Sequence, residues 1–518
     1  MNHRRSLLAG LSCALGAACT GGPPVSARDP VRLAPVAAAP TTLEQTFAPR
    51  AKDAAQGKNP ALPGNVDAYV AAGYDRLERG PGEDYVVHTF DEGPAPALGP
   101  AARRLVRFVH LADFQLPDDE SPTRVGLVDN AGVLSSALRP QDADLCRLTN
   151  ASVRTVNALH RQDPIDFVVL GGDNIDSAQE NELDWVMQIL DGADSVECDA
   201  GDDDDIIAGP DNDGKDPFFA EGLLMPWKWV TGNHDVLVQG NFAVTASNQA
   251  TAVSGTTLLG TRDYSSGLGG AVSDGDWVVP DPRRALLTRQ TMMQKIATDA
   301  DGHGIGEAQK RSGKAYYDFD VPGTPLVFLI IDASTEAGGG NGLIHQADVD
   351  AYVLPVLERA RREGKWVVLA SHQGVDNLTQ DGGEFGSFQE DALHAEQWRQ
   401  LLADYDNVLF SLVGHYHTHG AHRVQPASNN GRGYWEIVTA SISDFPNQFR
   451  TVEIWDGDNG FVLLRATVMD LALDDDAVAA AGRELSVIDY TSGWNPNFGM
   501  GETEARNIEL WIPKPAVP

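Results

Sequence analysis

Residues 227–235 read WKWVTGNHD, a short apolar run that passes through a glycine into an amide, an imidazole and a carboxylate. An apolar run of this length predicts a buried strand, and Gly232 allows the chain to turn sharply where the strand ends. Four more apolar runs end on metal-ligand residue types: Leu105 to His110 runs into Asp113, Phe167 to Leu170 into Asp173, Trp366 to Ala370 into His372, and Val408 to Val413 into His415 and His417. Because ligands bind at the carboxyl ends of strands in open α/β sheets, these five ends predict one site.

The pattern of apolar residues between these strands predicts the fold class. Apolar residues recur at helical spacing from Leu145 to Leu159 and again from Leu393 to Leu402, and Leu326 to Ile331 is a further expected strand. Strands that alternate with helices predict an α/β fold with largely buried sheets. Two long insertions interrupt it, a very acidic one at 198–217 and a Gly-, Ser- and Thr-rich one at 238–285. The acidic spacing does not match an EF-hand loop, so a solvated loop is favoured over a calcium site.

The ligand types at the strand ends are carboxylate, amide oxygen and imidazole, without thiolate. Such a set suits first-row metals such as Zn, Mn or Fe. The glycines before Asp173, Asn233 and His415 are expected to let the backbone approach a metal closely.

The order D-x-[H], G-D, G-N-H-[D/E], H, G-H-x-H resembles the signature of the calcineurin-like metallophosphoesterase superfamily, here from Asp113 to His417. The resemblance implies a four-layer α-β-β-α sandwich of two facing mixed sheets, with the long loop insertions added. It also implies two divalent metal ions, of Mn, Fe or Zn. By this resemblance, the first metal is bound by Asp113 and His417, Asp173 bridges both metals, and the second is bound by Asn233, His372 and His415. His234 is implied to be the catalytic residue that reaches the scissile phosphate.

Two positions depart from the family pattern. Gln115 stands where the family has a histidine, and its amide oxygen is predicted either to bind the first metal weakly or to act as a donor behind it. Asp176 stands where the purple acid phosphatase branch has its tyrosine, so the tyrosinate–iron site of that branch is absent. The segment from Tyr434 to Pro446 is instead similar to that of a secreted bacterial group.

Two neighbouring residues are candidates for supporting roles. Asp235 is a candidate to orient the His234 imidazole, and Arg124 is a candidate phosphate contact, although most arginines are simply solvated.

These features predict a metal-dependent hydrolase that cleaves a small phosphoester by attack of a metal-bridging hydroxide. A metal-dependent amide or ester hydrolase and a non-catalytic metal-holding surface protein remain alternatives. The chain has no G-x-S-x-G nucleophile elbow and no P-loop. A formal net charge of −35 disfavours nucleic-acid binding.

The N-terminal residues predict export, and the sequence as a whole predicts four segments. Residues 1–22 resemble an export signal, with the twin arginines Arg4-Arg5 before a short apolar stretch, and Cys19 raises the alternative of a lipoprotein signal. We therefore expect a periplasmic or cell-surface protein that meets the membrane only through a lipid on Cys19. Three more segments are expected after the signal: a tether and irregular extension (23–102), the metallophosphoesterase domain (103–450), and a C-terminal hairpin and tail that complete the fold (451–518). Cys146 and Cys198 are expected either to pair or to stay as buried thiols.

Overall fold

A computed structural model describes residues 29–53, 58, 60, 63–90, 93–126, 135–201, 211–259, 276–299, 301–335, 337–428, 431–495 and 498–515. The expected export signal with Cys19, the acidic residues 202–205 and residues 260–275 of the second insertion lie outside these ranges. No helix within them is long and apolar enough to cross a membrane.

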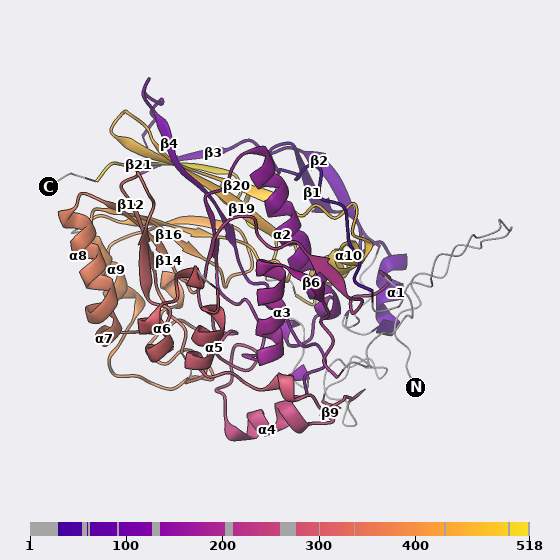
Figure 1. The fold of residues 1–518 in the computed structure, drawn as a ribbon. Helices are drawn as coiled ribbons and strands as arrows, with labels where there is room; N and C mark the ends of the chain where they lie inside the picture. The colour runs from indigo at the N-terminus through magenta and orange to yellow at the C-terminus, as the bar shows by residue number, and fades with distance from the viewer. Residues whose placement is uncertain are drawn as a thin grey trace.

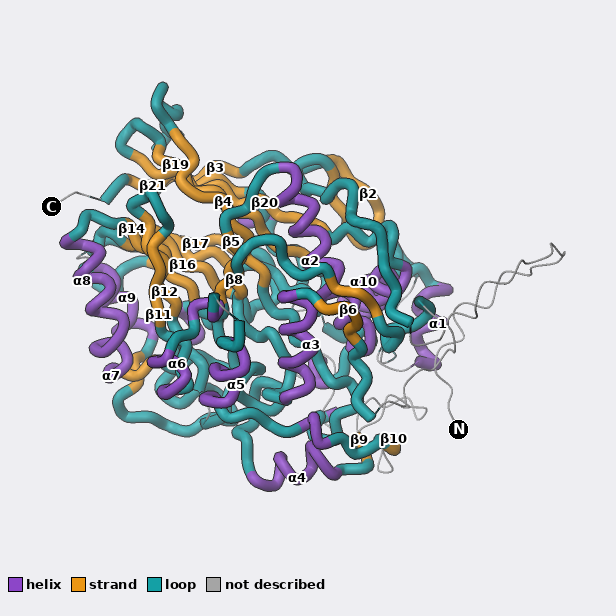
Figure 2. The backbone as a smooth tube through the Cα atoms, viewed as in Figure 1, coloured by secondary structure: helices purple, strands orange, loops and turns teal. Residues whose placement is uncertain are grey.

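Two large mixed sheets organise the chain (Figures 1 and 2). The seven-stranded sheet has the order β3 (Val86–Thr89), β21 (Ile508–Pro513), β20 (Phe461–Asp470), β19 (Gln448–Asp456), β4 (Arg103–Leu111), β5 (Phe167–Leu170), β8 (Trp227–Lys228). The six-stranded sheet has the order β11 (Tyr317–Asp320), β12 (Leu326–Ile330), β14 (Trp366–Ala370), β16 (Val408–Val413), β18 (Tyr434–Val438), β17 (Gly420–Val424). The predicted strands therefore all form, although β8 is shorter than its apolar run.

The two sheets face each other across an apolar core. The Phe328 ring of β12 lies 5.2 Å from the rings of Phe108 and Phe167, which belong to β4 and β5. Along β5, alternate residues point to opposite faces, so Phe167 enters this core while Val168 enters the cluster beneath the helices on the outer face. Burial on both faces explains why these strands are continuous apolar runs rather than alternating ones.

Helices cover the outer face of each sheet (Figure 1). The seven-stranded sheet packs against α2 (Leu145–Gln162), α3 (Glu180–Asp191) and α10 (Ala477–Thr491), and the six-stranded sheet against α8 (Leu354–Arg362) and α9 (Ala395–Ala403). This confirms the predicted α/β class with four layers. The remaining named helices and strands are β1 (Gln45–Pro49), α1 (Pro63–Ala71), β2 (Leu77–Pro81), β6 (Ala193–Val196), β7 (Phe218–Ala220), α4 (Ala246–Ser254), β9 (Thr257–Leu258), β10 (Asp276–Trp277), α5 (Arg289–Ile296), α6 (Glu307–Ser312), β13 (Ile344–His345), α7 (Gln346–Asp348) and β15 (Ala392–Leu393).

Both ends of the chain contribute to the seven-stranded sheet. The segment 23–102, expected to be irregular, contains β1, α1, β2 and β3, and β3 pairs in parallel with β21 near the other end of the chain. No local pattern specifies such a strand, because its partner is more than 400 residues away in sequence. The C-terminal hairpin is confirmed as β19 and β20, and β19 also pairs with β4 inside the sheet.

The acidic insertion differs from expectation in its described part. Asp213, Lys215 and Asp216 are buried rather than solvated, because Lys215 forms an ion pair with Asp119 and its neighbours hydrogen-bond one another. The segment is also tied down covalently at its start, where Cys198 forms a disulfide with Cys146 of α2.

Candidate metal centre

The ends of strands from both sheets meet at one place. His372 Nε2, after β14, lies 3.0 Å from Asp173 Oδ2, after β5. His417 Nε2, after β16, lies 3.2 Å from Asp113 Oδ1, after β4. The ligand atoms of Asp173, His372 and His415 all lie within 4.8 Å of one another. The strand ends therefore bring together residues that are as far apart in sequence as Asp113 and His417.

The backbone is unusual at these strand ends. Asp113, Asp173 and His415 adopt positive φ angles of 54°, 53° and 68°, a region that costs non-glycine residues about 1–3 kcal/mol. A Cβ on Gly232 would lie 2.1 Å from Asp173 Oδ1, and one on Gly414 would lie 2.6 Å from Asp113 Oδ2. These two glycines thus let the backbone lie close to the Asp173 and Asp113 carboxylates, and the predicted approach to a metal stays a prediction. Strain of this kind is typical of functional sites.

His372 has the hydrogen-bonding arrangement of a metal ligand. Its Nδ1 faces the Gly171 carbonyl oxygen at 2.7 Å, so Nδ1 donates its proton there and Nε2 faces the carboxylates. Nε2 is buried and makes no well-aligned hydrogen bond among the described residues, although the Asp173 oxygen is near. Burial lowers the pKa of His372, but Asp173 and Asp113 outweigh it and raise the pKa to about 9. The carboxylates therefore favour a positive charge at this position, and the donor set fits a divalent cation.

The other two histidines of the centre differ in their surroundings. Burial and the neighbouring His372 lower the pKa of His415 to about 3, so its imidazole is neutral and can act as a ligand. His417 Nδ1 hydrogen-bonds the Asp444 carboxylate at 2.6 Å. Burial lowers the pKa of His417, yet Asp113 and Asp444 raise it to about 9. A carboxylate behind a histidine in this way orients the ring towards a metal.

Asn233 is held with its oxygen as the only atom able to bind a metal. Its Nδ2 donates to the Gly240 carbonyl oxygen at 3.0 Å, and its Oδ1 accepts from Gln373 Nε2 at 3.1 Å. The role of Gln373 was missed, because nothing in the sequence marks it except its place directly after His372.

Gln115 was predicted to be either a weak metal ligand or a donor, and it is oriented here as a hydrogen-bond donor. Its Oε1 accepts a hydrogen bond from the Arg139 guanidinium, and its Nε2 donates to Asp173 Oδ2 at 3.2 Å. The oxygen therefore faces Arg139. Arg139 was not foreseen, and it also donates from Nε to Asp444 at 2.9 Å.

The residue that orients His234 is Asp176, and the hypothesis that named Asp235 is wrong. His234 Nδ1 lies 2.9 Å from the Asp176 carbonyl oxygen and 3.1 Å from its Oδ1. Burial lowers the pKa of His234, and the carboxylates of Asp173 and Asp176 raise it above its usual value. Arg124 is buried and donates to Asp176 at 2.9 Å, so the hypothesis of a direct phosphate contact is also wrong.

Asp235 instead clamps two loops of the centre together. Its carboxylate accepts from the backbone N–H groups of Gly232, Asp173, Asn174 and Ile175 at 2.7–3.1 Å, and from the Asn174 side chain at 3.1 Å. Burial and the nearby Asp173 raise the pKa of Asp235 to about 7, and its N–H donors oppose that shift. The clamp fixes the loop after β5 against the loop after β8.

A second group of ligand types lies elsewhere in the described structure. Asp191, Asp299 and His303 have ligand atoms within 4.8 Å of one another. The His303 ring stacks on Trp227 at 3.4 Å, at the start of β8, whereas Asn233 follows the other end of that strand. The two groups therefore lie at opposite ends of strand β8.

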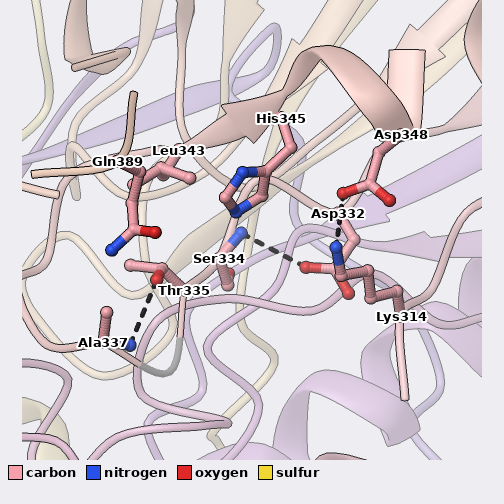
Figure 3. Close-up of a pocket in the computed structure, with 9 residues that line it drawn as sticks. All are labelled: Lys314, Asp332, Ser334, Thr335, Ala337, Leu343, His345, Asp348 and Gln389. Atoms are coloured by element: carbon pink, nitrogen blue, oxygen red, sulfur yellow. Dashed lines mark hydrogen bonds and ion pairs between the residues drawn. The ribbon is translucent and has the colours of Figure 1, made fainter. Parts of the chain in front are cut away.

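A small cavity of about 120 Å³ lies beside the loop that follows β12, and none of its lining residues belongs to the metal centre. Figure 3 shows its charged wall, with Lys314 paired to Asp348 and Asp332 accepting from the Ser334 backbone. At about 30 Å³ per water molecule in the liquid, this volume corresponds to about four waters.

No protein-family model and no curated protein matches this chain. Among solved structures, it is similar to the sulfate thiohydrolase SoxB of Thermus thermophilus, at 12% identity and a TM-score of 0.29, over 77% of this chain and 61% of that one. It is also similar to GAP50, the anchor in the inner membrane complex of Plasmodium, at 11% identity and a TM-score of 0.30, over 77% and 97%. The chain thus spans about three-fifths of the SoxB chain. With TM-scores this low, neither likeness supports a conclusion about activity.

Proposed function

We propose that this chain is a metal-dependent hydrolase of small phosphoesters. The observation that supports it best is the convergence of Asp173, His372 and His415, whose ligand atoms lie within 4.8 Å of one another. These residues follow strands of two different sheets, and hydrogen bonds orient the side chains of Asp173 and His372. The ordered resemblance of the motifs to calcineurin-like metallophosphoesterases supports phosphorus over carbon as the centre attacked.

Two cation positions are proposed around a shared carboxylate. Asp113 and His417 would hold the first cation, and Asn233, His372 and His415 the second, with Asp173 between them. Divalent cations of Mn, Fe or Zn, when bound there, supply Lewis-acid activation of water and of the phosphoryl oxygens.

The proposed role of His234 is to give a proton to the leaving oxygen. Its Nδ1–H is engaged by the Asp176 carbonyl oxygen, which turns Nε2 the other way, to 4.0 Å from Asp173 Oδ2. The His234 side chain is 12% exposed, whereas that of His372 is fully buried, so a substrate can reach His234. Asp176 and Arg124 behind it keep the imidazole in this orientation.

The disulfide between Cys146 and Cys198 supports the proposed location outside the cytoplasm, since such bonds persist in oxidising compartments. The export signal and the lipid on Cys19 remain proposals from the sequence.

The test is hydrolysis of one chromogenic phosphomonoester and one phosphodiester by the purified mature chain with Mn, Fe or Zn. Asp173→Asn is expected to abolish turnover, because it removes the carboxylate shared by both positions. Asp404→Asn, an exposed carboxylate at the end of α9, is the matched control and is expected to leave turnover unchanged. Absence of turnover with every metal while metal still binds would favour the non-catalytic alternative.

A further inference from the structure

We infer that the two cation positions are unequal, and that Gln115 and Arg139 make the first position weak. The inference rests on the proposed function. It states that the chain binds one divalent cation tightly, with Asp173, His372 and His415, and that a second joins Asp113 and His417 only at much higher concentration.

The orientation of the Gln115 amide carries the first step. A guanidinium has only N–H donors, so the atom of Gln115 that faces Arg139 must be the oxygen. The NH₂ group then faces Asp173 Oδ2 at 3.2 Å. An amide NH₂ has no lone pair for a metal, so Gln115 does not serve the first position as a ligand in this orientation. It is a positioning residue that donates to the shared carboxylate.

The charge of Arg139 carries the second step. Its side chain is fully buried, and a guanidinium stays protonated at any ordinary pH. Its carboxylate partner, Asp444, also accepts from His417, a proposed ligand of the first position. The Arg139 Nη1 group is buried without a hydrogen-bond partner among the described residues. A permanent positive charge, joined to the first position through one carboxylate and little screened by water, disfavours a second dication there.

The second position has no such neighbour. Around Asp173, His372 and His415, the hydrogen bonds come from backbone groups, histidines and the neutral amide of Gln115, and no arginine or lysine in the described residues bonds to them. Two imidazoles and a carboxylate meet there, and the Asn233 oxygen adds to them. The two positions therefore differ in ligand number and, among the described residues, in the buried guanidinium that lies behind the first.

The experiment titrates the metal-free, full-length mature chain with Mn²⁺ and follows binding by calorimetry and by the Mn²⁺ EPR signal. We expect one tight equivalent and a second that is weaker by about ten- to hundred-fold, the range typical for a lost ligand or supporting contact. The spectrum of a coupled Mn²⁺ pair should appear only with excess metal. Gln115→His supplies an imidazole at the first position, and it is expected to bring the second equivalent close to the first in affinity.

Two more variants keep the test decisive. Arg139→Met removes the charge, keeps much of the buried volume and is expected to tighten the second equivalent even if Gln115→His fails to fold. Gln400→His, on α9, adds a histidine away from the centre and should change neither affinity. Circular dichroism checks the fold of each variant.

Two Mn²⁺ equivalents that bind the unaltered chain with equal affinity would overturn the inference. So would unequal affinities whose difference is reduced neither by Gln115→His nor by Arg139→Met. Hydrolysis measured on the same samples separates the two proposals. One tight cation without hydrolysis contradicts the proposed function alone, whereas equal cations with hydrolysis contradict this inference alone.

Discussion

Replacement of Asp235 by asparagine is expected to destabilise the whole fold rather than only slow the reaction. The Asp235 carboxylate is fully buried and accepts five N–H hydrogen bonds, of which Oδ1 takes two and Oδ2 takes three. An asparagine must place its own NH₂ group where one of these oxygens stands. In the better of the two orientations, two backbone N–H groups, of Asn174 and Ile175, lose their acceptor.

The magnitude follows from these unsatisfied groups. A buried N–H without a partner costs roughly 1–3 kcal/mol, so two of them lower the free energy of unfolding by about 2–6 kcal/mol. That is a large part of the total stability of a typical protein, about 5–15 kcal/mol. The loop after β5 would also lose its attachment to the loop after β8, so we expect metal affinity to fall as well.

Urea unfolding of Asp235→Asn beside the Asp404→Asn control measures this loss directly. If Asp235 merely oriented His234, as the sequence suggested, turnover would fall while the unfolding midpoint stayed with that of the control. An unchanged midpoint would therefore refute the clamp.

Three further outcomes are expected. Cys146→Ala removes a cross-link across 52 residues, and the chain entropy gained by the unfolded state lowers the free energy of unfolding by about 4 kcal/mol. Urea unfolding measures this loss, and Cys198→Ala should have the same midpoint. Gly232→Ala forces a methyl group against Asp173, so it should cost about 1–3 kcal/mol or more and weaken Mn²⁺ binding; calorimetry showing full affinity would contradict the close approach. Partial burial of the Asp191 side chain, which is still 26% exposed, and then the neighbouring Asp299 raise its pKa to about 7, above the unfolded value of about 3.9. The folded state therefore loses stability as pH rises between these values, and Asp191→Asn should be as stable as the unaltered chain near pH 4 but more stable above about pH 7 in thermal unfolding.

The central strands could be predicted because a strand that is buried on both faces is a continuous apolar run in the sequence. Phe167 to Leu170 and Val408 to Val413 are apolar without interruption, and the structure returns them as β5 and β16 with those same bounds. The ligand types were visible for a related reason, since each stands directly after its strand. The edge strand β3 could not be predicted, because residues Val86 to Thr89 form a strand only by pairing with the distant β21.

The supporting residues of the centre lay beyond sequence reasoning. Asp235 stands next to His234 in the sequence and was therefore named as its partner, but the turn after β5 brings Asp176 to the imidazole instead. The acidic residues near Lys215 looked solvated because composition alone does not reveal a buried ion pair.

The sequence by itself determined the α/β class, the main strands and the ordered series of carboxylates, amides and imidazoles, since these depend on periodicity and on neighbours along the chain. Only the tertiary structure decided which groups face one another: Asp444 behind His417, Asp176 behind His234, and Arg139 turning the oxygen of Gln115 away from Asp173. The physical reason is that hydrogen bonds and ion pairs form through space. Their partners here are separated by as few as 24 and as many as 58 residues, and no local pattern encodes such distances.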